Sequence, residues 1–161
     1  MDMIKLQQVD LRCKRVLLRA DLNVSVEDGE ITSEQRILAS LDSVRYALEN
    51  NAAVLIISHF GRPKAGEYEA RYSLVQVREA IQNCLDRKVR LIPDWINGFE
   101  IKPGEIALGE NVRFLEGEVT CDPQLSQKMA RLCDVFVMDA VGAAHRAHAS
   151  ISGVVEFAPV A

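Results

Sequence analysis

The segment Ala53-Val54-Leu55-Ile56-Ile57 is apolar at every position, and the polar residues Ser58 and His59 follow it directly. A continuously apolar run of this length that contains β-branched residues is typical of a strand buried on both faces of a parallel sheet. We therefore expect this segment to be an interior strand, with its carboxyl end at His59.

Four further short apolar runs predict strands on either side of this segment. They lie at 15–20, 89–92, 106–108 and 135–138, and the run at 106–108 is compatible with a short extension through Val112. Between these runs, apolar residues recur at helical spacing over 35–48, 74–85 and 123–133. The chain therefore alternates short strands with helices of ordinary length.

Three local patterns predict where the helices begin. Thr32 with Gln35, and Ser73 with Gln76, have the spacing of capping boxes. Asp122-Pro123 is typical of an N-cap residue followed by proline at the first helical position.

Alternating strands and helices indicate βαβ units and a parallel sheet. We predict an α/β fold of three layers, an open parallel sheet with helices on both faces, similar to the Rossmann type. The 161 residues fit one domain, and no repeat or low-complexity linker divides them.

The composition of the chain argues against nucleic-acid and membrane partners. The chain has 19 Lys and Arg against 23 Asp and Glu, a formal net charge of −4. A net acidic chain is a poor candidate for general binding to nucleic acid or to an anionic membrane surface. Its longest apolar run, 52–57, is far shorter than the roughly 20 residues that span a bilayer. We therefore expect no nucleic-acid partner and no membrane partner.

The cysteines and the N-terminal residues bear on the cellular compartment. The four cysteines form no C-x-x-C pair and no zinc-like spacing, and the charged N-terminal residues leave no room for a signal-peptide core. These features predict free thiols and a cytoplasmic location.

Polar side chains gather just after the predicted strands. In an open α/β sheet, ligands bind at the carboxyl ends of the strands, so these residues are candidates for one site. Arg36 belongs with them, although a cation in the first turn of a helix is unusual, because the positive helix end favours acidic groups. The candidate residues are Asp21, Asn23, Arg36, His59, Arg62, Arg113 and Arg146.

Arginines in such a group would repel one another unless an anion joined them. Guanidinium groups match the geometry of phosphate and carboxylate, so we interpret the group as a site for a small ligand with several negative charges. Asp21 and Asn23 are placed to hold a hydroxyl or to orient an arginine. Each arginine taken alone is more simply a solvated surface charge or an ion-pair partner.

No metal site or nucleotide site is predicted. His145 and His148 lie at i, i+3 but have no third candidate ligand beside them. Gly61 and Gly66 have the glycine spacing of a P-loop, yet Glu67 and Tyr68 follow where Lys and Ser or Thr are needed.

Five segments of the chain together resemble the N-terminal domain of phosphoglycerate kinase, in that family's order and over nearly the whole sequence. They are Leu18-Arg19-Ala20-Asp21-Leu22-Asn23-Val24, Arg36-Ile37, Ser58-His59-Phe60-Gly61-Arg62-Pro63, Glu110-Asn111-Val112-Arg113-Phe114, and the run from Asp139 to Ser150. The resemblance implies one of the two α/β domains of a glycolytic kinase. That enzyme moves a phosphoryl group between 1,3-bisphosphoglycerate and ADP, giving 3-phosphoglycerate and ATP.

The resemblance also implies a role for each candidate residue. Asp21 and Asn23 would contact the carboxylate and hydroxyl end of the substrate, and Arg36, the one catalytic candidate, would face the transferring phosphoryl group. The side chains implied to hold the 3-phosphate are His59, Arg62, Arg113 and Arg146.

Length is the main departure from the family. The chain stops at Ala161, so we expect residues 1–161 to be the phosphoglycerate-binding domain, incomplete at its C-terminal end, with the nucleotide-binding domain absent. MgATP or MgADP would be a co-substrate held by that absent domain, and this fragment would bind no cofactor and be inactive alone. The complete enzyme is expected to be a monomer. Two alternatives remain open: a phosphoglycerate-binding module without catalysis, and an unrelated α/β phosphosugar enzyme.

Overall fold

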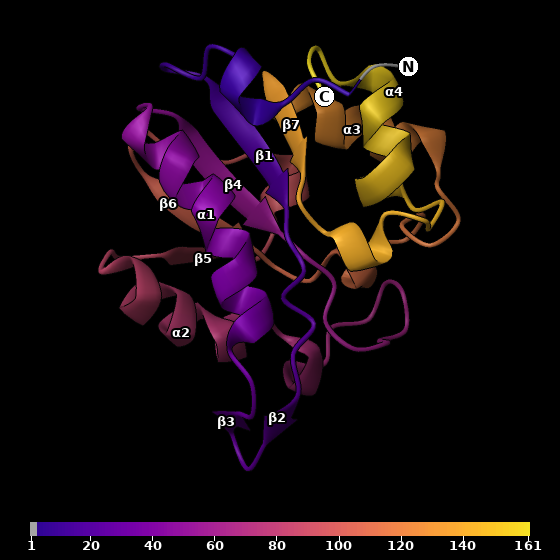
Figure 1. Cartoon of the computed structure of the whole chain (residues 1–161). Coiled ribbons are helices and arrows are strands. Elements are labelled where there is room, and N and C mark those ends of the chain that lie inside the picture. The colour runs from indigo at the N-terminus through magenta and orange to yellow at the C-terminus, as the bar shows by residue number, and fades with distance from the viewer. Residues whose placement is uncertain (1–2) are drawn as a thin grey trace.

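The computed structural model describes residues 3–161, and its regular elements alternate as the sequence predicts (Figure 1). In chain order they are β1 (Arg15–Arg19), β2 (Val26–Glu27), β3 (Glu30–Ile31), α1 (Gln35–Glu49), β4 (Ala53–Ile57), α2 (Val75–Leu85), β5 (Arg90–Ile92), β6 (Ile106–Gly109), α3 (Pro123–Arg131), β7 (Val135–Met138) and α4 (Val154–Phe157).

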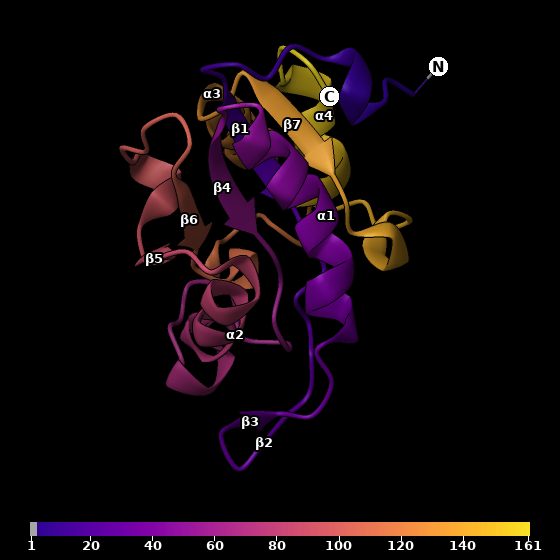
Figure 2. The ribbon, with the colours of Figure 1, turned by 60° about the vertical axis from the view of Figure 1, so that its left-hand side comes forward.

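Five strands form one sheet in the order β5-β6-β4-β1-β7, and every pairing in it is parallel. The segment Ala53–Ile57 is the middle strand, and all five of its residues are buried. The predicted parallel sheet and its interior strand are therefore confirmed. The short strands β2 and β3 pair with each other as an antiparallel hairpin, which projects beyond the end of α1 (Figure 2).

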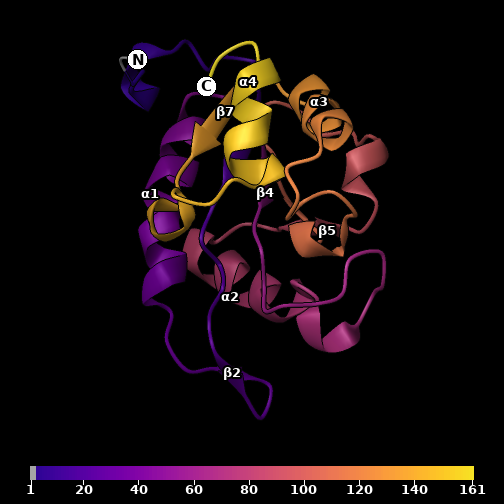
Figure 3. The ribbon, with the colours of Figure 1, turned by 90° about the vertical axis from the view of Figure 1, so that its right-hand side faces the viewer.

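Helices cover both faces of the sheet, which gives the three predicted layers. Helices α1 and α2 lie on one face, and α3 and α4 lie on the other (Figures 1 and 3). The strand side chains alternate accordingly: Val54 and Ile56 join the core under α1 and α2, whereas Leu55 and Ile57 join the core under α3 and α4. Such alternation follows from the two-residue period of a strand.

The suggested extension of the fourth predicted strand through Val112 is wrong. Strand β6 ends at Gly109, and a 3₁₀ turn follows over Val112–Phe114. The side chain of Asn111 causes this change, because its Oδ1 accepts a hydrogen bond from the backbone N of Arg113 at 3.0 Å. The turn aims the residues after β6 toward the loop after β4.

The predicted helix starts have different outcomes. Asp122 accepts a hydrogen bond from Leu125 N at 2.9 Å, as an N-cap residue should, and Pro123 is the first helical residue. Ser73 Oγ accepts from Val75 N at 3.2 Å, although no reciprocal capping box forms there. The prediction for Thr32 is wrong, because its hydroxyl donates to the carbonyl of Ser25 and so belongs to the β2–β3 hairpin.

The segment after β7 contains structure that the sequence pattern did not predict. A π-helical turn over Ala149–Gly153 leads directly into α4 and packs on α3. This turn fixes the chain just after Arg146 and His148. Within residues 3–161, no helix is long and apolar enough to cross a membrane.

Candidate functional site

The loops that carry the predicted ligand residues meet at one edge of the sheet. Because the strands are parallel, the carboxyl ends of β1, β4, β6 and β7 lie at the same edge. The loop after β1 carries Asn23, the loop after β4 carries His59, the turn after β6 carries Arg113, and the loop after β7 carries Arg146. Contacts between these loops define the site.

Asn23 joins the loop after β1 to two other segments. Its Oδ1 accepts a hydrogen bond from the backbone N of Gly61 at 2.9 Å, and its backbone O accepts one from Arg36 Nη1 at 2.9 Å. Arg36 Nη1 also lies 3.8 Å from Asp21 Oδ1. The cation in the first turn of α1 therefore has acceptors within the protein, which accounts for a position that the sequence alone leaves unusual.

Arg113 joins the turn after β6 to the loop after β4. Its Nη1 donates a 2.7 Å hydrogen bond to the carbonyl of Gly61, and its Nε is buried without a hydrogen-bond partner. Asn111 holds this arrangement, since its Nδ2 donates to the carbonyls of Phe60 at 2.7 Å and Tyr72 at 2.9 Å. A fixed guanidinium with a donor to spare is suited to receive an anion.

The electrostatics indicate that the cationic side chains lie close together. Burial is the main cause that lowers the pKa of Arg113 below its ordinary value, and the neighbouring charges of Arg146 and Arg62 lower that pKa further. Arg62 is exposed and Arg146 is partly buried. Like charges held this close favour a bound anion.

His59 is close enough to Arg113 and Arg146 to be affected by their charge, and it is 5% exposed. Burial, and then the charges of Arg19 and Arg113, lower the pKa of His59 to about 3, so the ring is neutral near pH 7. Its Nδ1 lies 3.0 Å from Arg19 Nη2. Because a guanidinium can only donate, Nδ1 must accept, and the ring proton is assigned to Nε2. His59 can therefore donate one hydrogen bond to an anion.

The predicted residues fall into two groups. Asp21, Asn23 and Arg36 form one group at the start of α1. The second group, which we call the group around Gly61, consists of His59, Arg62, Arg113 and Arg146. Arg113 bonds to the Gly61 carbonyl, and the charges of Arg62 and Arg146 act on Arg113. The two groups are joined by the bond from Gly61 to Asn23, and no hydrogen bond within residues 3–161 links the Arg36 side chain directly to the second group. The same range holds no cluster of three or more His, Cys, Asp or Glu side chains that could bind a metal ion.

The comparisons with known proteins identify the family. The family model described as "Phosphoglycerate kinase" matches residues 6–161. The chain belongs to the phosphoglycerate kinase family. A "Phosphoglycerate kinase" of Legionella pneumophila (strain Paris) is 51% identical over all of this chain, which spans only 41% of that relative's length.

Solved phosphoglycerate kinase structures share the fold. The structure of phosphoglycerate kinase from Coxiella burnetii superposes with a TM-score of 0.95 at 42% identity, over 99% of this chain and 40% of that one. The enzyme from Pyrococcus horikoshii OT3 gives a TM-score of 0.86 at 33% identity, over 98% of this chain and 42% of that one. The α/β fold is therefore that of one part of a phosphoglycerate kinase.

Three residues outside the predicted set, namely Arg19, Glu118 and Ser150, are connected to the site of this phosphoglycerate kinase chain. Each has an exposed fraction of 0%, and a chain of hydrogen bonds from Glu118 through Ser150 and Arg19 reaches His59. One signal was present for Arg19, which is a charged residue at the end of an apolar strand. Ser150 ends one of the segments that carry the family resemblance, whereas nothing local distinguishes Glu118.

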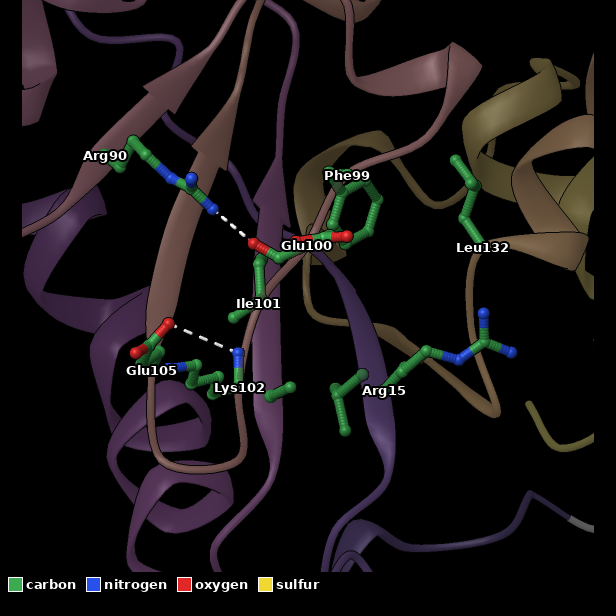
Figure 4. Close-up of a pocket in the computed structure, with 10 residues that line it drawn as sticks. Arg15, Arg90, Phe99, Glu100, Ile101, Lys102, Glu105 and Leu132 are labelled. Atoms are coloured by element: carbon green, nitrogen blue, oxygen red, sulfur yellow. Dashed lines mark hydrogen bonds between the residues drawn. The ribbon is translucent and has the colours of Figure 1, made fainter.

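Open clefts also occur away from this site. Figure 4 shows one of about 540 Å³ at the opposite edge of the sheet, lined by residues that include Arg15, Arg90, Phe99 and Lys102. Two of its cations already have partners: Arg15 pairs with Asp134 at 3.1 Å, and Arg90 donates to the carbonyl of Glu100. This cleft lies away from the residues that the family motifs select.

Proposed function

We propose that this chain is the phosphoglycerate-binding part of a phosphoglycerate kinase and that it binds 3-phosphoglycerate or 1,3-bisphosphoglycerate at the carboxyl edge of its sheet. One observation carries the proposal: Arg113 is fixed at Gly61 with an unpartnered buried Nε, among Arg62, Arg146 and the neutral ring of His59. Membership of the family supplies the identity of the ligand.

The two groups of side chains suit the two ends of such a ligand. The arginines around Gly61 and the Nε2–H of His59 would hold the 3-phosphate, because charge-assisted hydrogen bonds from guanidinium groups match phosphate geometry. Asp21 and Asn23 would contact the carboxylate and hydroxyl end. The bond between Asn23 Oδ1 and Gly61 N ties both ends of the site to one backbone position.

In the complete polypeptide, we propose that the bound substrate exchanges a phosphoryl group with ADP or ATP in the glycolytic reaction. Phosphoryl transfer depends mainly on alignment and on neutralisation of charge. Arg36 would supply positive charge to the migrating group, because its side chain is 59% exposed beyond the Asn23 carbonyl and can reach outward. MgADP or MgATP would be held by the part of the relatives that lies outside this chain. By itself, the chain would bind no nucleotide and would have no turnover.

A titration with two ligands tests this function. Amide NMR spectra of the chain are recorded with increasing 3-phosphoglycerate and, separately, with MgADP. We expect saturable shifts around Asn23, Gly61 and Arg113 with the first ligand and none with the second. Saturable shifts with MgADP would show that the nucleotide site is misplaced, and no shifts with 3-phosphoglycerate would overturn the proposed function.

The variant Arg131→Ala is a matched control for this titration. Arg131 is an exposed arginine at the end of α3, on the face of the sheet away from α1. Its loss removes one positive charge without touching either group of site residues. The shifts with 3-phosphoglycerate should therefore be the same in this variant as in the unmodified chain.

A further inference from the structure

Glu118 is a buried carboxylate whose charge acts on Arg113 and Arg19. It follows the 3₁₀ turn that carries Arg113, and its exposed fraction is 0%. Its Oε2 accepts a hydrogen bond from Ser150 N at 3.0 Å, its Oε1 accepts one from Ser150 Oγ at 2.5 Å, and its backbone O accepts one from Ala149 N at 2.8 Å. Glu118 therefore holds the segment that follows Arg146 and His148.

Ser150 connects Glu118 to Arg19. The Ser150 hydroxyl donates a hydrogen bond to Glu118, and the same oxygen accepts one from Arg19 Nε at 3.0 Å. Arg19 is fully buried, and its side chain also donates to the carbonyl of Ala20 at 2.6 Å and to His59 Nδ1 at 3.0 Å. A continuous chain of hydrogen bonds therefore runs from the Glu118 carboxylate to the imidazole of His59.

The charges around Glu118 are otherwise mostly positive. Burial, together with the charges of Arg113 and Arg146, lowers the pKa of Arg19 to about 10, and Glu118 is the first of the carboxylates that oppose this change. Glu118 also opposes the lowering of the pKa of Arg113. His148 Nδ1 lies 3.9 Å from Glu118 Oε1 on the other side. Buried cations without such a partner are costly to hold together.

We propose that Glu118 is a positioning residue that serves as the resident counter-charge of the site, holding Arg19, His59 and the arginines around Gly61 in place before an anion binds. The identity of that anion rests on the proposed function. Glu118 does not contact the ligand and acts through Ser150 and Arg19. A bound phosphate would supply negative charge from the open side of the cluster, so Glu118 and the ligand stabilise the same arrangement from opposite sides.

The variant Glu118→Gln tests this role, because it keeps the shape and one acceptor oxygen while removing the charge. We expect a lower thermal midpoint in anion-free buffer. Saturating 3-phosphoglycerate or inorganic phosphate should then raise the midpoint of the variant more than that of the unmodified chain, by about 3 °C or more. The matched control is Glu116→Gln, which removes the same charge from an exposed position two residues away and should change neither quantity.

The sign of the anion effect separates the proposal from a purely structural role. If Glu118 only holds the segment after Arg146 by hydrogen bonds, its replacement makes a ligand-binding arginine less ordered. Anions then stabilise the variant less than the unmodified chain. That result would overturn the proposal. If Glu118→Gln does not fold in buffer, it should fold when phosphate is added, and failure to do so would equally count against the role. Glu118→Asp keeps the charge and should restore most of the anion-free stability.

A second readout does not depend on the substrate. The ¹⁵N chemical shifts of the His59 ring report which nitrogen carries the proton. In the ligand-free chain we expect the proton on Nε2, and in ligand-free Glu118→Gln a mixture of tautomers. An unchanged single tautomer in the variant would contradict the positioning role even if 3-phosphoglycerate binds. Conversely, if 3-phosphoglycerate does not bind but the tautomer is disturbed in the variant, the proposed function is refuted and the positioning role of Glu118 stands.

Discussion

The guanidinium of Arg113 donates a 2.7 Å hydrogen bond from Nη1 to the backbone carbonyl of Gly61, and this contact joins the turn after β6 to the loop after β4. The amide of the same glycine donates to Asn23 Oδ1 at 2.9 Å. Gly61 therefore lies between the two groups of candidate ligand residues. The backbone at Gly61 has φ +61°, and a Cβ there would lie 2.5 Å from the ring of Tyr72, so both its conformation and its packing require glycine.

The first prediction concerns Arg113. Arg113→Ala should weaken binding of 3-phosphoglycerate by about 1.5–3 kcal/mol, the usual range for hydrogen bonds to charged groups. Affinity of the unmodified chain should also fall with added salt, because the attraction is between charges. Titration calorimetry measures both effects, with Arg131→Ala as the control that loses an exposed arginine elsewhere. Equal affinities for Arg113→Ala and the control would remove Arg113 from the site.

The second prediction separates binding from chemistry and applies to the full-length enzyme. Arg36→Ala should lower kcat by about a hundredfold or more while changing substrate affinity less, because charge that faces a migrating phosphoryl group acts mainly in the transition state. Steady-state kinetics give kcat and KM separately. A raised KM with kcat intact would show instead that Arg36 only binds the ground state.

The third prediction concerns pH. Burial and the charge of Arg19 lower the pKa of His59 from 6.5 to about 3. Below pH 6.5 the unfolded chain therefore binds a proton at this residue that the folded chain does not, so His59 makes stability fall as the pH decreases from about 6.5 toward 3. Burial raises the pKa of Glu118, so this residue has the opposite effect and makes stability rise as the pH decreases through its titration range.

Replacing His59 isolates its share of this dependence, because Glu118 is present in both proteins. The free energy of unfolding should fall less steeply with decreasing pH in His59→Gln than in the unmodified chain. Denaturant unfolding at several values of pH measures these slopes. The control His145→Gln removes an exposed histidine from the loop after β7 and should leave the slope unchanged. Identical slopes for both variants would mean that His59 titrates normally.

Most of the fold was predictable because its signals are local. The apolar run at Ala53–Ile57 and the helical spacing around it lie within single elements, and each element can be recognised without knowledge of its neighbours. The β2–β3 hairpin was not predicted, because two strands of two residues are too short to show an alternating pattern. Thr32 was misassigned for the same reason, since its partner Ser25 lies across that hairpin.

In the candidate site, too, local signals were predictable and contacts between distant segments were not. Residues such as His59 and Arg113 directly follow recognisable strands, so their place at one edge could be inferred from the parallel topology. The buried contacts behind them could not. Arg19 and Ser150 are 131 positions apart, and Ser150 and Glu118 are 32 apart, so only the folded chain brings them together.

The last prediction tests the packing that fixes the segment after Arg146. Gly153 ends the π-helical turn, and a Cβ added there would lie 2.1 Å from Ser126 Oγ and 3.0 Å from Cys121 Sγ. Its φ of −63° is acceptable for alanine, so the cost of Gly153→Ala would come from overpacking against Ser126 and Cys121 alone. We expect a loss of about 1–3 kcal/mol in the free energy of unfolding.

The double variant Gly153→Ala with Ser126→Ala removes the closest atom and should recover most of that loss, whereas Ser152→Ala, at the exposed neighbouring position, should have little effect. Chemical denaturation of the four proteins gives the comparison. If the double variant is no more stable than Gly153→Ala, contact with the Ser126 hydroxyl is not what makes glycine necessary at position 153.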